Sequence, residues 1–245
     1  MASAADVEIK VILSGDATEA AAELLGLDPE DGKRRAIYFW DRPRPDGDAV
    51  RLPLLDAGAV IRLRLDEDGD KGDLTAKRRP CDPDTLPEDW RESREGEDWE
   101  FTVEEDWAGR DRVWAASLKV DGRYERPAEN GSAQPELSRD QRMLLSTAEV
   151  AAATLDDLTA LGPIRAVRWK AARRDLIHPL VAELWTVGDE LRFLELSLRS
   201  EPAVASLAQH LLERGLGDLG LRPPARQVLK TRQAMTALAR ARARV

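Results

Sequence analysis

Short segments in which apolar and charged residues strictly alternate recur along this chain, and they constrain its fold more than any other feature. In the first, Val7 and Ile9 alternate with Asp6, Glu8 and Lys10. A period of two predicts a β-strand with one face in an apolar core. The polar positions of the later segments are Arg62, Arg64, Thr75, Lys77, Arg79, Glu100, Thr102, Glu104, Asp106, Ser117, Lys119, Arg168, Lys170, Glu195, Ser197 and Arg199.

The charged faces of these strands admit two arrangements. In the ordinary one they face water, because a sheet packed on one side exposes the other. In the second they line the inside of a closed barrel whose apolar outer surface is covered by helices. Burying so many charges is unfavourable unless they are paired. A triphosphate with bound Mg²⁺ or Mn²⁺ would pair both signs, since guanidinium groups bind phosphate and carboxylates bind hard cations.

Helical segments separate and follow the strands. The spacing from Ser138 to Gln141 is that of a capping box, and Gly162-Pro163 is expected to end the helix that starts there. Helices are expected at residues 16–27, 138–161, 203–214 and 225–242.

The length of 245 residues suits one large domain or two small ones. Because the alternating pattern returns after the second helix, we assign residues 1–200 to a barrel with an inserted helix at about 138–161. Residues 201–245 are then C-terminal helices that pack on the barrel.

Composition narrows the functional classes. A net charge of −9 argues against non-specific binding of nucleic acid, which needs a basic surface. We find neither a signal-peptide pattern nor about 18 consecutive apolar residues, so we expect no membrane contact and a cytoplasmic location. The single cysteine, Cys81, excludes an intramolecular disulfide and suits a reducing compartment. There is no P-loop, and two histidines are too few for a zinc site or a Ser-His-Asp triad.

Five short motifs, in order along the chain, resemble those of the CYTH superfamily, the triphosphate tunnel metalloenzymes. Residues 6–10 (DVEIK) resemble its ExExK signature, and residues 38–41 (YFWD) resemble its YFDT-like strand. Residues 61–64 (IRLR) and 74–77 (LTAK) resemble its LRxR and LTxK strands, and residues 193–197 (FLELS) resemble its terminal FxExE strand. Lys230-Thr231 also resembles its SKT-like element, which would bring Lys230 to the mouth of the channel.

The resemblance implies an α+β fold, an eight-stranded antiparallel β-barrel open at both ends with peripheral α-helices. It further implies a triphosphatase that hydrolyses inorganic tripolyphosphate or a small organic triphosphate with Mg²⁺ or Mn²⁺ as cofactor. Glu8 and Glu104 are the candidate catalytic residues. The phosphate ligands it implies are Lys10, Arg62, Arg64, Lys77, Lys119, Arg168 and Lys170, and the metal ligands are Asp6, Glu8, Glu104, Asp106 and Glu195.

The sequence departs from the family pattern at three positions. Asp6 replaces a glutamate, Ser197 stands where a second glutamate is usual, and Trp185 lies where relatives often carry an aspartate, with Glu183 as the neighbouring carboxylate. Two alternatives therefore stay open: a class IV-type adenylate cyclase, in which the 3′-hydroxyl of the substrate replaces water, and a non-catalytic phosphate- or polyphosphate-binding module. The expected partner is a small-molecule triphosphate, and the expected state is a monomer or a homodimer.

Overall fold

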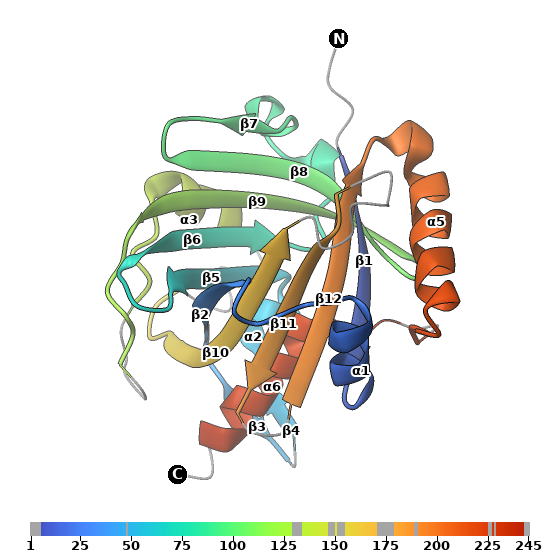
Figure 1. Ribbon diagram of the computed structural model, residues 1–245. Coiled ribbons are helices and arrows are strands. Elements are labelled where there is room, and N and C mark those ends of the chain that lie inside the picture. Colours follow the sequence, from blue (N-terminus) through green and yellow to red (C-terminus); the bar gives the residue numbers. More distant parts are fainter. Residues whose placement is uncertain are drawn as a thin grey trace.

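A closed barrel forms the body of the protein (Figure 1). The computed structural model describes residues 6–47, 49–128, 134–146, 150, 155–170, 179–188, 191–224, 227 and 229–242. Ten strands form the main sheet, and β7 (Arg94–Glu95) pairs only with β8, so nine strands make the ring. In spatial order the ring is β1 (Val7–Ser14), β12 (Leu191–Ser200), β11 (Val181–Val187), β10 (Thr159–Lys170), β2 (Lys33–Asp41), β5 (Ala59–Asp66), β6 (Lys71–Arg78), β9 (Asp111–Arg123) and β8 (Trp99–Ala108).

The ring closes where β1 pairs with β8, and this pair is parallel. The expected α+β barrel is confirmed, but the expected eight strands, all antiparallel, are wrong in number and in direction. The two differences have one cause. Strand direction can alternate all the way round a ring only if the number of strands is even, so a ring of nine must contain a parallel pair.

The outside of the barrel is apolar and carries two clusters of buried side chains. One cluster covers β2, β5, β6, β8 and β9 and packs against α3 (Arg139–Leu145) and α2 (Pro53–Asp56). The other covers β1, β11 and β12 and packs against α1 (Ala17–Leu24) and α5 (Ala205–Asp218). The remaining elements are the hairpin of β3 (Arg44–Asp46) and β4 (Ala49–Arg51) and the 3₁₀ turns η1 (Pro83–Thr85), η2 (Glu88–Trp90) and η3 (Pro202–Val204).

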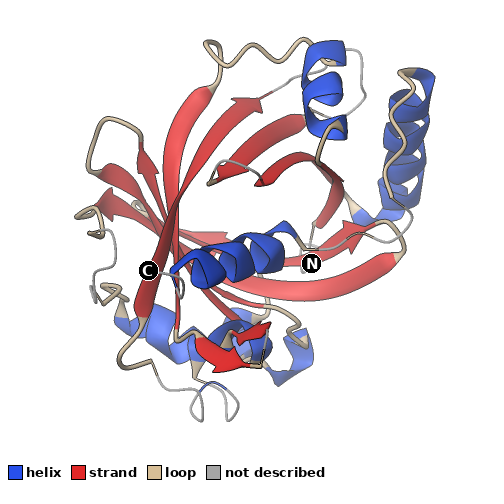
Figure 2. Cartoon of the chain, turned by 90° about the horizontal axis from the view of Figure 1, so that it is seen from below, coloured by secondary structure: helices blue, strands red, loops and turns tan. Residues whose placement is uncertain are grey.

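A third apolar cluster fills one end of the barrel. Phe39, Trp185 and Phe193, which share strand faces with the interior charges, pack there against Ala234 and Met235 of α6 (Lys230–Arg242). Seen along the barrel, α6 lies across this end (Figure 2). The barrel is therefore closed at the α6 end, and the expectation of a channel open at both ends is wrong.

The helix expected at residues 138–161 is much shorter than the sequence indicates. Ser138 and Gln141 form the predicted capping box, but α3 ends at Leu145 and the strand β10 already begins at Thr159. Residues 147–149 and 151–154 of the expected helix lie outside the described residues. Gly162-Pro163 falls inside β10, at an irregularity in its pairing with β2. A Cβ on Gly162 would lie 2.7 Å from the main-chain oxygen of Ile37, so the close approach of the two strands requires glycine.

The other expected helices occur with shifted ends, as α1, α5 and α6; residues 225, 226 and 228 of the last expected range lie outside the described residues. No helix of the described chain is long and apolar enough to cross a membrane.

Candidate active site

The interior of the barrel is charged, because the polar faces of the strands point inward. Alternation places Leu194, Leu196 and Leu198 of β12 in an outer cluster, and Glu195 and Ser197 on the opposite face. The same parity holds in β5, where Ile61 and Leu63 pack outside. The second of the two arrangements considered for the sequence is therefore the one that occurs.

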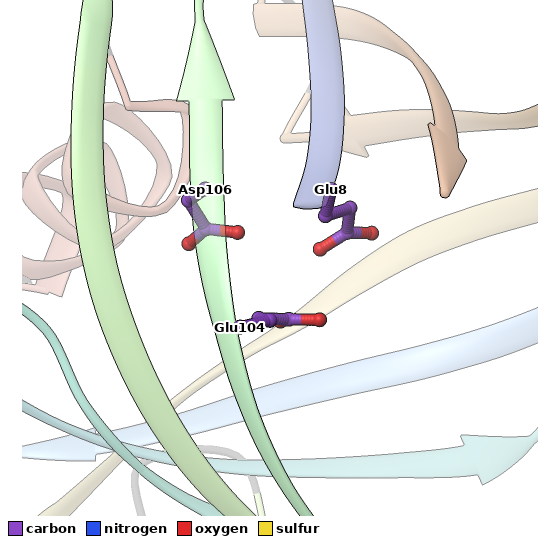
Figure 3. A group of neighbouring side chains, drawn as sticks. All are labelled: Glu8, Glu104 and Asp106. Carbon is purple, nitrogen blue, oxygen red and sulfur yellow. The ribbon is translucent and has the colours of Figure 1, made fainter. Parts of the chain in front are cut away.

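Three carboxylates meet at the seam of the barrel (Figure 3). Glu8 comes from β1, and Glu104 and Asp106 come from successive inward positions of β8. One carboxylate oxygen of each lies within 4.8 Å of the others. Glu104 and Asp106 are 4% and 1% exposed, whereas the Glu8 side chain is 19% exposed, so two of the three carboxylates are almost removed from water and the third is half-buried.

Four cations contact the carboxylate group. Lys10 Nζ lies 2.6 Å from Glu8 Oε2 and 2.7 Å from Asp106 Oδ1, and it hydrogen-bonds to the latter. The ammonium of Lys77 reaches Asp106 Oδ2 at 3.2 Å and Glu104 Oε1 at 3.4 Å. The remaining two contacts are those of Arg79 Nε with Asp106 Oδ2, at 2.8 Å, and of Arg199 Nη2 with Glu104 Oε2, at 3.3 Å.

These surroundings separate the pKa values of the three carboxylates. Burial is the main cause that raises the pKa of Glu104; the charge of Glu8 also raises it, and Lys77 and Lys10 lower it without cancelling the rise. Burial also acts to raise the pKa of Asp106, but Lys10, Lys77 and Arg79 outweigh it and hold that pKa far below its usual range. Burial also acts to raise the pKa of Glu8, but the opposing effect of Lys10 contributes to a pKa below its usual value. Glu104 is thus the member of the group most ready to take up a proton.

The residues of the carboxylate group fit a divalent cation. Mg²⁺ and Mn²⁺ prefer oxygen ligands, and three carboxylates with converging oxygens, two of them buried, supply them. Buried carboxylates in such proximity repel each other and need a cation for their charge to persist. In the protein alone, the lysine and arginine contacts supply that compensation.

A second set of interior charges, the arginine group, is built around Asp73 of β6. Arg64 Nε is 3.0 Å from both carboxylate oxygens of Asp73, and Arg35 Nη1 is 4.0 Å from one of them. Among the described residues, Arg62 makes one long hydrogen bond, 3.5 Å from its Nη2 to Thr75 Oγ1, and its buried Nε has no hydrogen-bond partner. Within the described chain, no carboxylate lies within 4.0 Å of the Arg62 guanidinium.

Burial is the main cause that lowers the pKa of Arg62, to about 10, and the charge of Arg64 adds to it. Arg168 lies near the same group, and burial lowers its pKa as well. A guanidinium that is buried without a carboxylate is costly to keep charged. An anion that entered the barrel would relieve this cost, so the arginine group is suited to bind phosphate oxygens.

Glu195 does not join the carboxylate group. Its Oε1 lies 2.9 Å from Nζ of Lys230, the first residue of α6, and Glu183 Oε2 lies 2.7 Å from the same Nζ. Lys230 therefore reaches into the barrel, at the closed end.

The other predicted site residues lie farther out. Asp6 is exposed at the start of the described chain, and its main-chain oxygen accepts a hydrogen bond from Glu105. Lys119 pairs with Glu100 and Asp121 at 2.8 Å and 3.4 Å rather than with the carboxylate group. Lys170 is exposed at the end of β10. The functional roles assigned to these residues stay predictions.

Sequence reasoning assigned no role to several residues that the structure brings into the interior. Arg79 and Arg199 stood at polar positions of the alternating pattern, so that pattern was the signal that could have found them. Asp73 also stands on the polar face of an alternating segment, two residues before Thr75. Arg35 had no comparable signal, because only the pairing of β2 with β5 and of β5 with β6 brings it near Asp73.

Comparison with known proteins supports the fold. Neither a protein-family model nor a curated protein matches the sequence. A candidate adenylate cyclase from Bacillus halodurans has a structure that is similar to this one with a TM-score of 0.53 at 14% identity, over 95% of this chain and 98% of that one. A candidate adenylyl cyclase from Hippeastrum, for which a dominant triphosphatase activity is described, is similar with a TM-score of 0.54 at 17% identity, over 96% of this chain and 95% of that one. The chain therefore has the closed-barrel fold of these two structures.

Proposed function

We propose that this protein is a divalent-metal-dependent triphosphatase that acts on inorganic tripolyphosphate or a small organic triphosphate. The observation that carries the proposal is the buried guanidinium of Arg62, which has no carboxylate partner among the described residues and lies in the same interior as the carboxylate group. An interior that holds both a guanidinium without a carboxylate partner and a group of converging carboxylates is complementary to a polyanion with a bound metal ion.

The arginine group and the carboxylate group would have different roles in this reaction. Arg62, Arg64 and Arg168 would bind the phosphate oxygens and stabilise the charge that develops on the leaving phosphate. A divalent cation held by Glu8, Glu104 and Asp106 would supply neutralisation of phosphate charge and orientation of the reacting groups.

Proton transfer falls to Glu104 in this proposal. In the protein without metal its pKa is raised, whereas Asp106 stays ionised beside Lys10, Lys77 and Arg79, so Glu104 is the better of the two to accept the proton of an attacking water. Lys10 and Lys77 hold the carboxylates in place and lower the negative potential that a triphosphate would meet.

The test is phosphate release from tripolyphosphate, ATP and thiamine triphosphate by the purified protein. Each substrate is assayed with Mg²⁺, with Mn²⁺ and with EDTA. We expect metal-dependent release that EDTA abolishes, and the ranking of rates names the substrate. Absence of release from all three substrates would contradict the proposal.

Adenylate cyclase activity is the second candidate, because both structures compared above are of candidate cyclases. Product analysis with ATP separates the two: cyclic AMP with pyrophosphate supports a cyclase, and ADP with phosphate supports a hydrolase. Tight binding of triphosphate without any product would instead support a binding module.

A further inference from the structure

We propose that the ammonium group of Lys230 occupies the position of a second cation inside the barrel, so that divalent metal binds only at Glu8, Glu104 and Asp106. The inference concerns the metal content of the site and rests on the proposed function for the identity of that site.

Glu183 and Glu195 by themselves form a pair that requires a cation. They are direct partners across β11 and β12, and their side chains are 11% and 14% exposed. Two carboxylates so close and so buried repel each other unless a positive charge lies between them. Their oxygens are the donors that a divalent cation would use.

Lys230 fills that position from the end of α6. Its Nζ lies 2.7 Å from Glu183 Oε2, 2.9 Å from Glu195 Oε1 and 4.0 Å from the centre of the Trp185 ring. The indole face attracts a cation but offers no oxygen ligand. The ammonium is therefore held on three sides in surroundings that suit it better than a divalent metal.

The packing of α6 fixes the ammonium in place. Ala234 and Met235, one helical turn beyond Lys230, are 0% and 1% exposed and belong to the apolar cluster that closes the barrel. The Lys230 side chain itself is only 9% exposed. The packing of α6 therefore anchors the backbone of Lys230 beside Glu183 and Glu195.

The two acidic sites are separate along the strands. Glu195 lies opposite Ile12 of β1, whereas Glu8 lies opposite Arg199, four residues farther along β12. Four residues of a strand span about 13 Å. The inward position between them is Ser197, which adds no carboxylate that could join the sites.

The experiment is a titration of the full-length, substrate-free protein with Mn²⁺, in which electron paramagnetic resonance measures the free ion. We expect the wild-type protein to bind a single Mn²⁺ ion. Lys230→Arg keeps the charge and should also bind a single ion. Lys230→Met should bind a second ion. Glu104→Gln should weaken the single site of the wild type by at least about tenfold, and Glu195→Gln should leave it unchanged.

Two results would overturn the inference: a second ion bound by the wild type, or a loss of affinity in Glu195→Gln as large as in Glu104→Gln. If Lys230→Met does not fold without metal, the comparison of Glu195→Gln with Glu104→Gln decides. Metal content is measured without turnover. A protein that shows the expected pattern of ions but releases no phosphate would therefore disprove the triphosphatase and leave the role of Lys230 standing.

Discussion

Glu8 of β1 lies directly opposite Asp106 of β8 in the parallel strand pair that closes the barrel. The carboxylate group therefore lies at the β1–β8 pair that closes the ring. Lys10 spans it, since its ammonium contacts Glu8 on its own strand and Asp106 on the other. Four consecutive positions of β1 pair with β8, from Val7 to Lys10, so the same short contact both closes the ring and aligns the acidic side chains.

Replacing Glu8 by glutamine should separate metal-dependent turnover from substrate binding. The change keeps the size of the side chain but removes one of the charges that would bind the metal. We expect kcat to fall about 100-fold or more, with little change in the Kd for tripolyphosphate measured by calorimetry without metal. Unaltered turnover would remove Glu8 from the site.

Replacing Arg62 by methionine should make the protein more stable and a poorer binder of triphosphate. The substitution removes a buried guanidinium without a carboxylate, which is typically neutral or stabilising when the volume is kept. Loss of a charged hydrogen bond to phosphate should weaken binding by about tenfold to 100-fold.

Chemical denaturation and calorimetry with tripolyphosphate measure these two effects of Arg62→Met. Arg112→Met is the control, because Arg112 stacks on Trp107 outside the barrel, 3.8 Å from the ring centre. Binding by Arg62→Met as tight as that of the control would contradict the assignment.

The ion pair of Arg64 and Asp73 should make the protein sensitive to acid. Burial acts to raise the pKa of Asp73, but Arg64 and Arg62 outweigh it and leave that pKa below its ordinary value of 3.8. The folded state therefore binds fewer protons than the unfolded state in this range. The stabilisation is complete above about pH 4 and is lost as the pH falls through the lower pKa of the folded state.

Thermal unfolding followed from pH 6 to pH 2 measures this dependence. In Asp73→Asn, which cannot titrate, the Tm should fall less steeply below about pH 4 than in the wild type. Equal slopes in the two proteins would show that another group controls the acid response.

Gln141 should be a purely structural residue of α3. Its Nε2 donates hydrogen bonds to the main-chain oxygens of Leu74 and Leu118, at 2.7 Å and 3.2 Å, and its Oε1 accepts one from Ser138 N. Gln141→Leu removes these hydrogen bonds and should lower the free energy of unfolding by about 1–3 kcal/mol. Denaturant titration measures the loss. The exposed neighbour Arg142, changed to alanine, should lose far less, and a change in triphosphate binding by Gln141→Leu would show that α3 also affects the interior.

The sequence allowed the lining of the barrel to be predicted because a strand presents alternate side chains to opposite faces. Glu8, Arg62 and Glu104 could be placed on inward faces from their immediate neighbours alone. The count of strands and the parallel seam could not be predicted, since pairing of β1 with β8 joins segments nearly a hundred residues apart. No local pattern encodes that contact.

Other errors came from patterns that suit two structures. Leu155, Leu158 and Leu161 stand at helical spacing, yet Leu161 lies in a strand whose side chains pack at the closed end of the barrel. The partner of Glu195 was also hidden, because a lysine at the start of a basic helix gives no sign that it will be buried between two glutamates.

Because α6 closes one end of the barrel, the interior is accessible from the other end. Arg199, which contacts Glu104, is 52% exposed, so the carboxylate group opens to solvent at the end away from α6. A substrate would therefore enter, and its products would leave, through the same opening of the barrel. If the protein is a triphosphatase, bound phosphate product would block entry of the next substrate. Inhibition by the product should therefore be competitive.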